Sequence, residues 1–288
     1  MSARFEVLLA AVLFSTGGAA IKACGLSSVQ VACFRSGIAA LTLVVLLPGA
    51  RRAWDWRAVA VGGAYAATMV LYVLANKLTT AANTIFLQSS APLYILFLAP
   101  WLVGERFRAR DLGFMLLLAV GVTLFFLSSS PGALTAPDPF RGDVLAACSG
   151  LTWALTILGL RWLASAPGTD GGTGTALLIG NLLACAVCLP GAFPLGVATS
   201  GDWMLVVYLG TCQIGLAYLF LSRGVAGVPA LDASLLLLVE PVLNAIWAWM
   251  IHAEQPGPFA LAGGGIILVA TAWKAWGDVP ERSMATGG

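Results

Sequence analysis

Ten apolar segments, each about long enough to cross a bilayer, account for most of the chain. A transmembrane helix needs about 20 predominantly apolar residues. The segments cover approximately residues 5–22, 29–48, 57–76, 80–102, 110–129, 142–163, 172–190, 203–222, 229–251 and 257–275. The connections between them are short, as in a compact bundle. The sequence therefore predicts an all-α integral membrane protein with ten transmembrane helices.

Composition excludes a soluble domain. Apolar residues make up 59% of the chain and charged residues 10%, whereas soluble domains have about 45–50% and about 25%. A soluble domain of this length cannot hide so much apolar surface. No basic patch suits nucleic acid. Arg4 and Glu6 lead straight into an apolar run without a small-residue cleavage site, so no cleaved signal is expected. The expected partners are membrane lipid and a small-molecule solute, with the protein acting as a monomer.

One proline-containing segment, residues 82–110, occurs a second time near the end of the chain. The register that aligns Pro92 with Pro241 also pairs Glu105 with Glu254 and Asn83 with Asp232. A proline removes one amide donor and bends a helix, which frees the carbonyls of Gln88 and Leu237. In a membrane, such carbonyls are tolerated where they are buried in protein or face a watery cavity. The repeated segment thus predicts the working centre of a duplicated protein.

The duplication predicts an inverted arrangement. Five spans per half is an odd number, so the second half enters the membrane from the opposite side, as in transporters with inverted repeats. Further pairs support the register, namely Tyr72 with Tyr218, Lys77 with Arg223 and Phe14 with Trp153. We expect two inverted five-helix repeats, 1–131 and 132–288, within one integral transporter domain.

The basic residues predict the orientation. With the N-terminus in the cytoplasm, only Lys22, Lys77 and Arg141 of the 15 basic residues fall on the outer side, and Arg35 lies within the second segment. Cytoplasmic loops carry the excess of Lys and Arg in membrane proteins. We expect a multi-pass inner (plasma) membrane protein with both termini in the cytoplasm.

Several motifs resemble those of a known family. They are Phe14-Ser-Thr-Gly followed by Ala20-Ile-Lys22, Tyr72 followed by Asn76-Lys77, and Pro92 followed by Gly104-Glu105-Arg106. Together with the ten spans, they are similar to the drug/metabolite transporter superfamily, and within it to the EamA-type exporters, including the YddG-like amino-acid exporters. The second copy departs from the pattern, with His252-Ala253-Glu254 in place of Val103-Gly104-Glu105. The resemblance implies export of amino acids and related metabolites across the inner membrane by alternating access.

Helical spacing gathers polar and aromatic residues that could line a central cavity. The candidates are Tyr65, Tyr72 and Asn76 in the third span, Gln88 and Tyr94 beside the fourth-span bend, Trp153 in the sixth span, Tyr218 in the eighth, and Glu240, Asn244 and Trp247 in the ninth; Pro92 and Pro241 are the candidate hinges or gates. An alternative for Tyr65, Tyr94 and Trp247 is the aromatic belt at the membrane surface. Lys22 and Lys77 are expected to extend along the helix ends to water. Glu105 and Glu254 are expected to have structural roles.

Glu240 directly precedes Pro241, deep in an apolar run. A carboxylate at membrane depth is costly and usually pairs with another group or lines a pathway. It could exchange a proton, contact a substrate amine, pair with an internal cation such as Arg35, or form a hydrogen bond across the bundle. Its counterpart in the first copy is Ala91, so any such role is asymmetric.

The motifs exclude most enzyme and pump classes. His252 is the single histidine, and the chain has neither an HExxH nor a Gly-x-Ser-x-Gly motif. No metal site and no cofactor are expected, and the absence of a Walker motif disfavours an ATP-driven pump. The leading hypothesis is a secondary exporter of amino acids, among them aromatic and other neutral ones. The alternatives are a passive channel and a multidrug-type exporter of lipophilic cations, for which Glu240 would exchange the proton.

Overall fold

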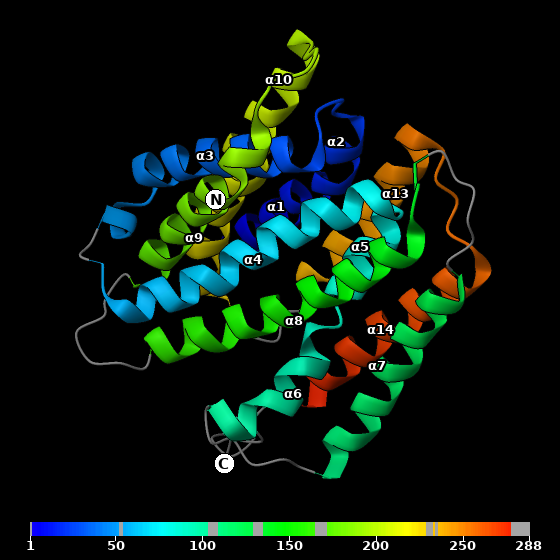
Figure 1. Ribbon diagram of the computed structural model, residues 1–288. Coiled ribbons are helices and arrows are strands. Elements are labelled where there is room, and N and C mark those ends of the chain that lie inside the picture. The colour runs from blue at the N-terminus through cyan, green and yellow to red at the C-terminus, as the bar shows by residue number, and fades with distance from the viewer. Residues whose placement is uncertain are drawn as a thin grey trace.

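The computed structural model shows an all-helical bundle (Figure 1). It describes residues 2–51, 54–102, 109–128, 135–164, 172–228, 233 and 236–277. The first half contains α1 (Ala3–Ser15), α2 (Gly17–Ala23), α3 (Ser28–Leu46), α4 (Trp56–Leu78), α5 (Ala81–Gln88), α6 (Ala91–Leu102) and α7 (Ala109–Ser128). The second half contains α8 (Pro139–Ala164), α9 (Gly172–Cys188), α10 (Ser200–Tyr208), η3 (Leu209–Leu216), α11 (Ala217–Gly224), α13 (Val239–His252) and α14 (Pro258–Gly277). Three short turns of 3₁₀ helix are η1 (Pro48–Arg51), η2 (Leu189–Ala192) and η4 (Val225–Gly227).

Within these described residues, each of the ten predicted apolar segments contains helix. Seven helices or runs of consecutive helices combine the length and apolar character that a membrane span needs: Ala3–Ala23, Ser28–Leu46, Trp56–Leu78, Ala81–Leu98, Pro139–Leu163, Gly172–Ala192 and Ser200–Gly224. Two shorter apolar helices cover Leu112–Leu124 and Pro258–Trp273. The ninth predicted segment is represented by α13, and residues 229–232 and 234–235 of it lie outside the described part. The prediction of an all-helical membrane protein is confirmed.

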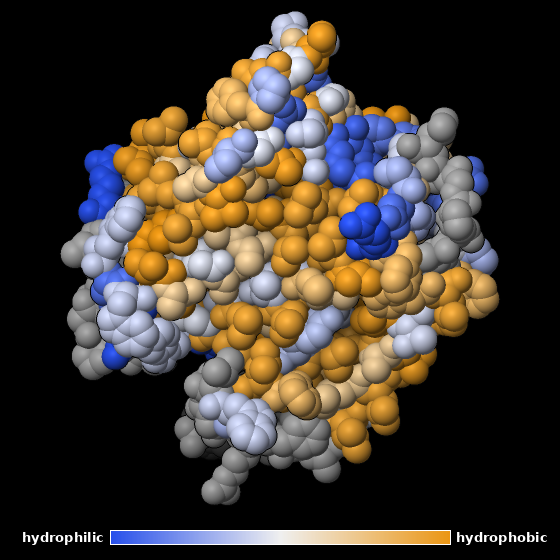
Figure 2. Space-filling view, in the orientation of Figure 1, coloured by the Kyte–Doolittle hydropathy of each residue, from blue (hydrophilic) through white to orange (hydrophobic). Residues whose placement is uncertain are grey.

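The outer surface of the bundle is apolar where contact with lipid requires it. Large apolar side chains such as Leu41, Trp101 and Val269 are exposed. In the view of Figure 2, apolar residues cover the middle of the face, and hydrophilic residues gather towards the two ends of α4 and α8. Lipid tails solvate the first kind of surface, and headgroups and water solvate the second.

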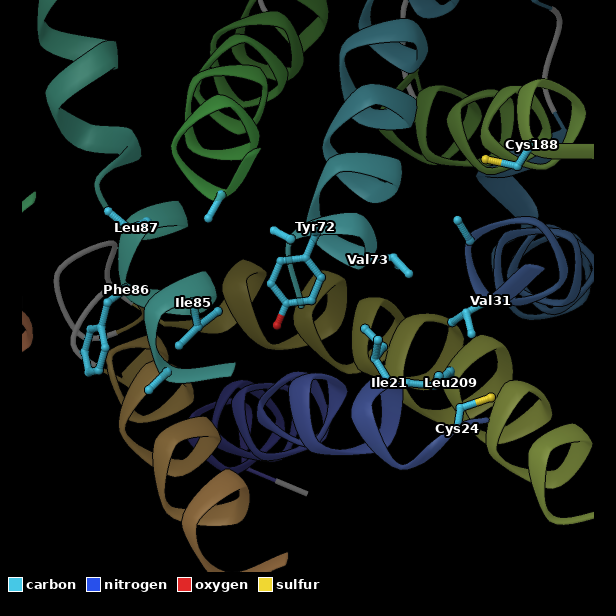
Figure 3. Packing of buried hydrophobic residues seen from close by; sticks show 14 of the residues in the cluster. Ile21, Cys24, Val31, Tyr72, Val73, Ile85, Phe86, Leu87, Cys188 and Leu209 are labelled. Atoms are coloured by element: carbon cyan, nitrogen blue, oxygen red, sulfur yellow. The ribbon is translucent and has the colours of Figure 1, made fainter. Parts of the chain in front are cut away.

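Small residues let the spans pack closely inside. At the crossing of α4 and α9, a Cβ on Gly180 would lie 2.5 Å from Cδ1 of Tyr65 and 2.7 Å from the Gly62 carbonyl oxygen. Such close backbone approach is typical of packed membrane helices. The largest buried cluster joins both halves of the chain, and Tyr72 projects into its centre between Ile85 of α5 and Ile21 of α2 (Figure 3).

Both predicted proline bends are breaks between helices. In the fourth span α5 ends at Gln88 and α6 begins at Ala91, so Pro92 lies in the first turn of a new helix. In the ninth span α13 begins at Val239, and Pro241 again lies in the first turn. Proline fits there because the first helical turn has no partner for its amide. The expectation of one bent helix at each proline is corrected accordingly.

Two further interruptions carry no proline. The first span breaks at Thr16, between α1 and α2. The eighth span widens into a π-helix, η3, between α10 and α11. Short π segments within α-helices occur frequently at functional sites. Four spans are thus irregular within the described part of the chain, and these irregularities position the site described next.

Candidate solute-binding site

A cavity of about 310 Å³ lies where the four interrupted spans meet. Each interruption contributes lining residues: Phe14 before the break at Thr16, Gln88 and Ser89 at the α5–α6 break, Gln213 and Ile214 in η3, and Leu238 and Glu240 at the start of α13. Unwound backbone at membrane depth is found where it borders protein or a cavity. The interruptions and the cavity are therefore parts of one feature.

Seven of the twelve candidates from the sequence line this cavity. They are Tyr72, Gln88, Pro92, Trp153, Tyr218, Glu240 and Pro241. They come from α4, α5, α6, α8, α11 and α13, so residues far apart in the sequence share one space. The paired tyrosines Tyr72 and Tyr218, one from each half, both face the cavity.

The other five candidates lie outside the lining. The ring of Tyr65 is fully buried and packs edge-to-face against Tyr218, with centroids 5.9 Å apart. Asn244 donates to the Tyr72 hydroxyl at 3.2 Å, and Asn76 donates to the Tyr72 carbonyl at 3.0 Å. Tyr65, Asn76 and Asn244 thus contact the cavity tyrosines Tyr72 and Tyr218 without lining the cavity themselves.

The remaining two of the five are Tyr94 and Trp247. Nε1 of Trp247 donates to Oγ of Ser15 at 3.0 Å, which ties α13 to α1. Tyr94 is half-buried, and its ring lies beside Gly150 of α8. Both side chains contact neighbouring helices and lie outside the cavity lining.

Sequence reasoning missed several lining residues, and the most important are Phe14, Arg35 and Gln213. Phe14 was paired with Trp153 across the repeats, which was an available signal for its position. Gln213 lies in η3 and donates from Nε2 to the Phe14 carbonyl at 3.4 Å, where α1 ends. No local sequence pattern predicts the π-helix that turns Gln213 inward, so this contact could not be predicted from the sequence.

Four aromatic residues are among the described lining of the cavity. Phe14 and Tyr218 pack edge-to-face with centroids 5.1 Å apart and an interplanar angle of 76°. Trp153 and Tyr72 add two further rings from α8 and α4. Aromatic side chains offer large rigid surfaces for apolar groups and an attractive face for cations.

Two charged residues face the same cavity without meeting. Arg35 of α3 is 1% exposed, and its Nη2 donates to the carbonyl and sulfur of Met69 at 3.3 and 3.5 Å. Glu240 lies in the first turn of α13, where a helix N-terminus favours an anion. Among the described residues, neither forms an ion pair. The hypothesis that Arg35 neutralises Glu240 directly is therefore not supported by the contacts.

A buried polar cluster closes one end of the bundle. Nζ of Lys22 lies 2.9 Å from Oε1 of Glu254, and both side chains are only 3% exposed. Lys22 also donates to the carbonyl of Thr79 at 2.7 Å, and Oε2 of Glu254 accepts from the amide of Ala81 at 2.9 Å. Lys22 also donates to the carbonyl of Thr135 at 2.6 Å. Lys22 was expected to reach water, and that expectation is wrong because a carboxylate and two carbonyls hold its ammonium inside.

The same cluster continues through the neighbouring helices. Asp143 of α8 accepts from Oγ1 of Thr79 at 2.7 Å and from Nδ2 of Asn83 at 3.1 Å. Lys77 donates to the carbonyl of Cys24, so it too bonds within the protein. Glu254 has the structural role expected of it, whereas Glu105 and Asp232 lie outside the described residues. The cluster joins α2, α4, α5, α8 and the end of α13.

The cavity lies away from this closed end. Asp143 stands near the start of α8, and Trp153 follows ten residues later, about 15 Å along the helix at 1.5 Å per residue. Likewise Glu254 follows the end of α13, and Glu240 lies at its start. Since α1 and α2 run from Ala3 towards Lys22, the cluster lies at the end of the bundle opposite to the start of the chain.

The fold and cavity define a multi-pass helical membrane protein of the transporter class. The model of the EamA-like transporter family matches residues 2–127 and again residues 140–274. The chain therefore belongs to the EamA-like transporter family, and the resemblance found in its motifs is confirmed. The double match also confirms the duplication that Pro92 and Pro241 indicated. Membership makes the protein a transporter and not an enzyme.

Named relatives are similar along most of their length. The pseudopaline exporter CntI of Pseudomonas aeruginosa is 24% identical over 91% of this chain and 92% of its own. The aromatic amino acid exporter YddG of Ancylobacter novellus is 26% identical over 88% of this chain and 83% of its own. A solved crystal structure superposes with a TM-score of 0.64 at 22% identity, covering 95% of this chain and 96% of that one, which supports the fold.

Proposed function

We propose that this protein exports amino acids, including aromatic and other neutral ones, and related metabolites from the cytoplasm by alternating access. The observation that carries the proposal is the cavity of about 310 Å³, whose wall combines aromatic rings with polar side chains. Cavities for drug-sized ligands span about 300–1,000 Å³, so this one suits a small metabolite. The relative named as an aromatic amino acid exporter points to the same class.

The transport cycle follows from the proposed inverted repeats, 1–131 and 132–288. In such carriers the two repeats rock around a fixed central site, and Pro92 and Pro241 would mark the hinges. We place both termini on the cytoplasmic side of the inner membrane. In that orientation, the Lys22–Glu254 cluster closes the outer end of the bundle. A fluorescent protein that folds only in the cytoplasm, fused to the C-terminus, should fluoresce; a dark, full-length fusion would contradict this orientation.

The central test is exchange by purified protein in liposomes, where it is proposed to act as a monomer. We expect unlabelled phenylalanine trapped inside the liposomes to drive saturable uptake of labelled phenylalanine. A carrier that releases labelled phenylalanine inside binds an unlabelled molecule there and carries it out. Empty liposomes and liposomes containing the Tyr72→Ala variant provide the baselines. Flux that stays linear with concentration and shows no counterflow would indicate a passive channel instead.

A second candidate is export of lipophilic cations in exchange for protons. The specific observation in its favour is Glu240, a carboxylate that lines the cavity and has no ion pair among the described residues. For this candidate, Glu240→Gln is expected to abolish resistance to lipophilic cations in cells, because glutamine cannot carry the proton. Persistence of amino-acid exchange in the same variant would favour the second candidate further, whereas undiminished resistance would remove it.

A further inference from the structure

Arg35 is the one described cation on the cavity wall. Its helix, α3, packs tightly on η3, where a Cβ on Gly210 would lie 2.7 Å from Cβ of Ile38 and 2.9 Å from the Arg35 carbonyl oxygen. The guanidinium reaches across to Met69 of α4 at 3.3 Å. Helices α3 and α4 and the π segment thus fix both ends of this side chain, which gives Arg35 a defined position in the site.

The guanidinium of Arg35 has hydrogen-bond donors that are not used within the protein. It offers five N–H donors and remains protonated in proteins. In this structure Nη2 bonds to Met69, whereas Nε is buried without a hydrogen-bond partner. A permanent charge at membrane depth with so few partners is costly, and such residues usually mark a substrate or ion pathway. The arrangement therefore calls for an anion.

No described side chain supplies that anion. Glu240 faces the same cavity, yet no ion pair joins it to Arg35. Tyr72 and Tyr218 line the same cavity as the two charged residues. The missing counter-charge must come from the solute.

We propose that Arg35 is the anchor for the carboxylate of the transported solute. Arginine pairs with carboxylates through charge-assisted hydrogen bonds, often two in parallel. The apolar part of the solute then packs against Phe14, Tyr218 and Trp153. This inference rests on the proposed export of amino acids and adds a recognition rule: the solute must carry a free carboxylate, and the loss of its amino group costs less than the loss of its acid.

The test compares four relatives of one compound: phenylalanine, its amide, the decarboxylated amine and the deaminated acid. Each is measured for stabilisation of the purified protein against heat and for competition with labelled phenylalanine in liposomes. We expect both carboxylates to stabilise the wild type and to compete, and the amide and the amine to do neither. In Arg35→Met, the two carboxylates should bind roughly tenfold to a hundredfold more weakly, as the loss of a charge-assisted pair predicts.

Two features separate this role from a structural one. Arg35→Lys keeps the charge and should retain the preference for acid over amide at reduced affinity. Arg35→Met removes a buried charge without a described counter-ion, so its unfolding temperature without ligand should not fall, because an apolar side chain avoids the cost of burying the charge. An Arg35→Met protein that still prefers acid to amide as strongly as the wild type would overturn the proposal, as would equal binding of acid and amide by the wild type.

The failure of this inference is distinguishable from the failure of the proposed function. Binding of the deaminated acid that depends on Arg35, in a protein that exchanges no amino acid, would support the anchor and reject amino-acid export. Exchange of phenylalanine that depends on neither the carboxylate nor Arg35 would support amino-acid export and reject the anchor.

Discussion

Removing one partner of the Lys22–Glu254 pair should destabilise the protein by about 3–5 kcal/mol, the usual cost of leaving a buried charge without its partner. The pair lies at 2.9 Å with both side chains 3% exposed. In Glu254→Leu, the Lys22 ammonium keeps only carbonyl partners, and the Ala81 amide loses its acceptor. Thermal unfolding of the purified variant, followed by tryptophan fluorescence, measures the effect.

Two matched variants show whether the effect comes from the buried pair. The double variant Lys22→Met/Glu254→Leu should recover much of the lost stability, because it removes both charges together. Arg141→Gln breaks a pair at the same end of the bundle, with its arginine side chain 78% exposed, and should cost less than about 1 kcal/mol. Equal losses in the double and single variants would contradict the ion-pair explanation.

Tyr218→Ala should reduce amino-acid exchange by about tenfold to a hundredfold. The ring of Tyr218 lines the cavity and packs edge-to-face on Phe14 at 5.1 Å and on Tyr65 at 5.9 Å. Burying an aromatic side chain contributes about 1.5–3 kcal/mol, and every 1.4 kcal/mol of binding energy corresponds to a factor of ten. Tyr72→Ala should have a similar effect, and it also leaves Asn244 without the hydroxyl to which it donates. Initial rates of counterflow, corrected for the amount of inserted protein, give the measurement.

Tyr94→Ala is the matched control for these two variants. Tyr94 also comes from the repeated segments, but it lies outside the cavity lining and packs beside Gly150. Exchange by this variant should stay within about twofold of the wild type. A loss as large as that in Tyr218→Ala would show that the tyrosines act through packing rather than through the cavity wall.

Most of the fold could be predicted because a bilayer imposes a length and an apolar composition on every span. Each of the ten segments contains helix within the described residues. Pro92 and Pro241 marked two of the four interruptions, since proline acts through local geometry. The breaks at Thr16 and in η3 could not be read from the sequence, because tertiary contacts such as Gln213 on the Phe14 carbonyl determine them.

The site could be predicted only in part, for a related reason. Helical spacing correctly placed Tyr65, Tyr72 and Asn76 on one stripe of α4, and only Tyr72 of the three reaches the cavity. Tyr65 packs against α9 where that helix passes close at Gly180. The spacing along one helix indicates which residues share a face, whereas the crossing of the next helix determines how far along that face the cavity extends. For the same reason, the sequence could not predict that Lys22 is buried.

Each half contains two irregular spans, but these spans do not all occupy equivalent positions in the two repeats. The fourth and ninth spans break at equivalent prolines, but the first and eighth spans are interrupted while their counterparts, α8 and α4, run continuously. The two halves therefore present different backbone conformations to the same cavity. Detailed balance prevents an uncoupled carrier from using such a difference to pump. Such a difference can change the affinity and the rates on each side of the membrane, whereas the direction of net flux is set by the solute gradient.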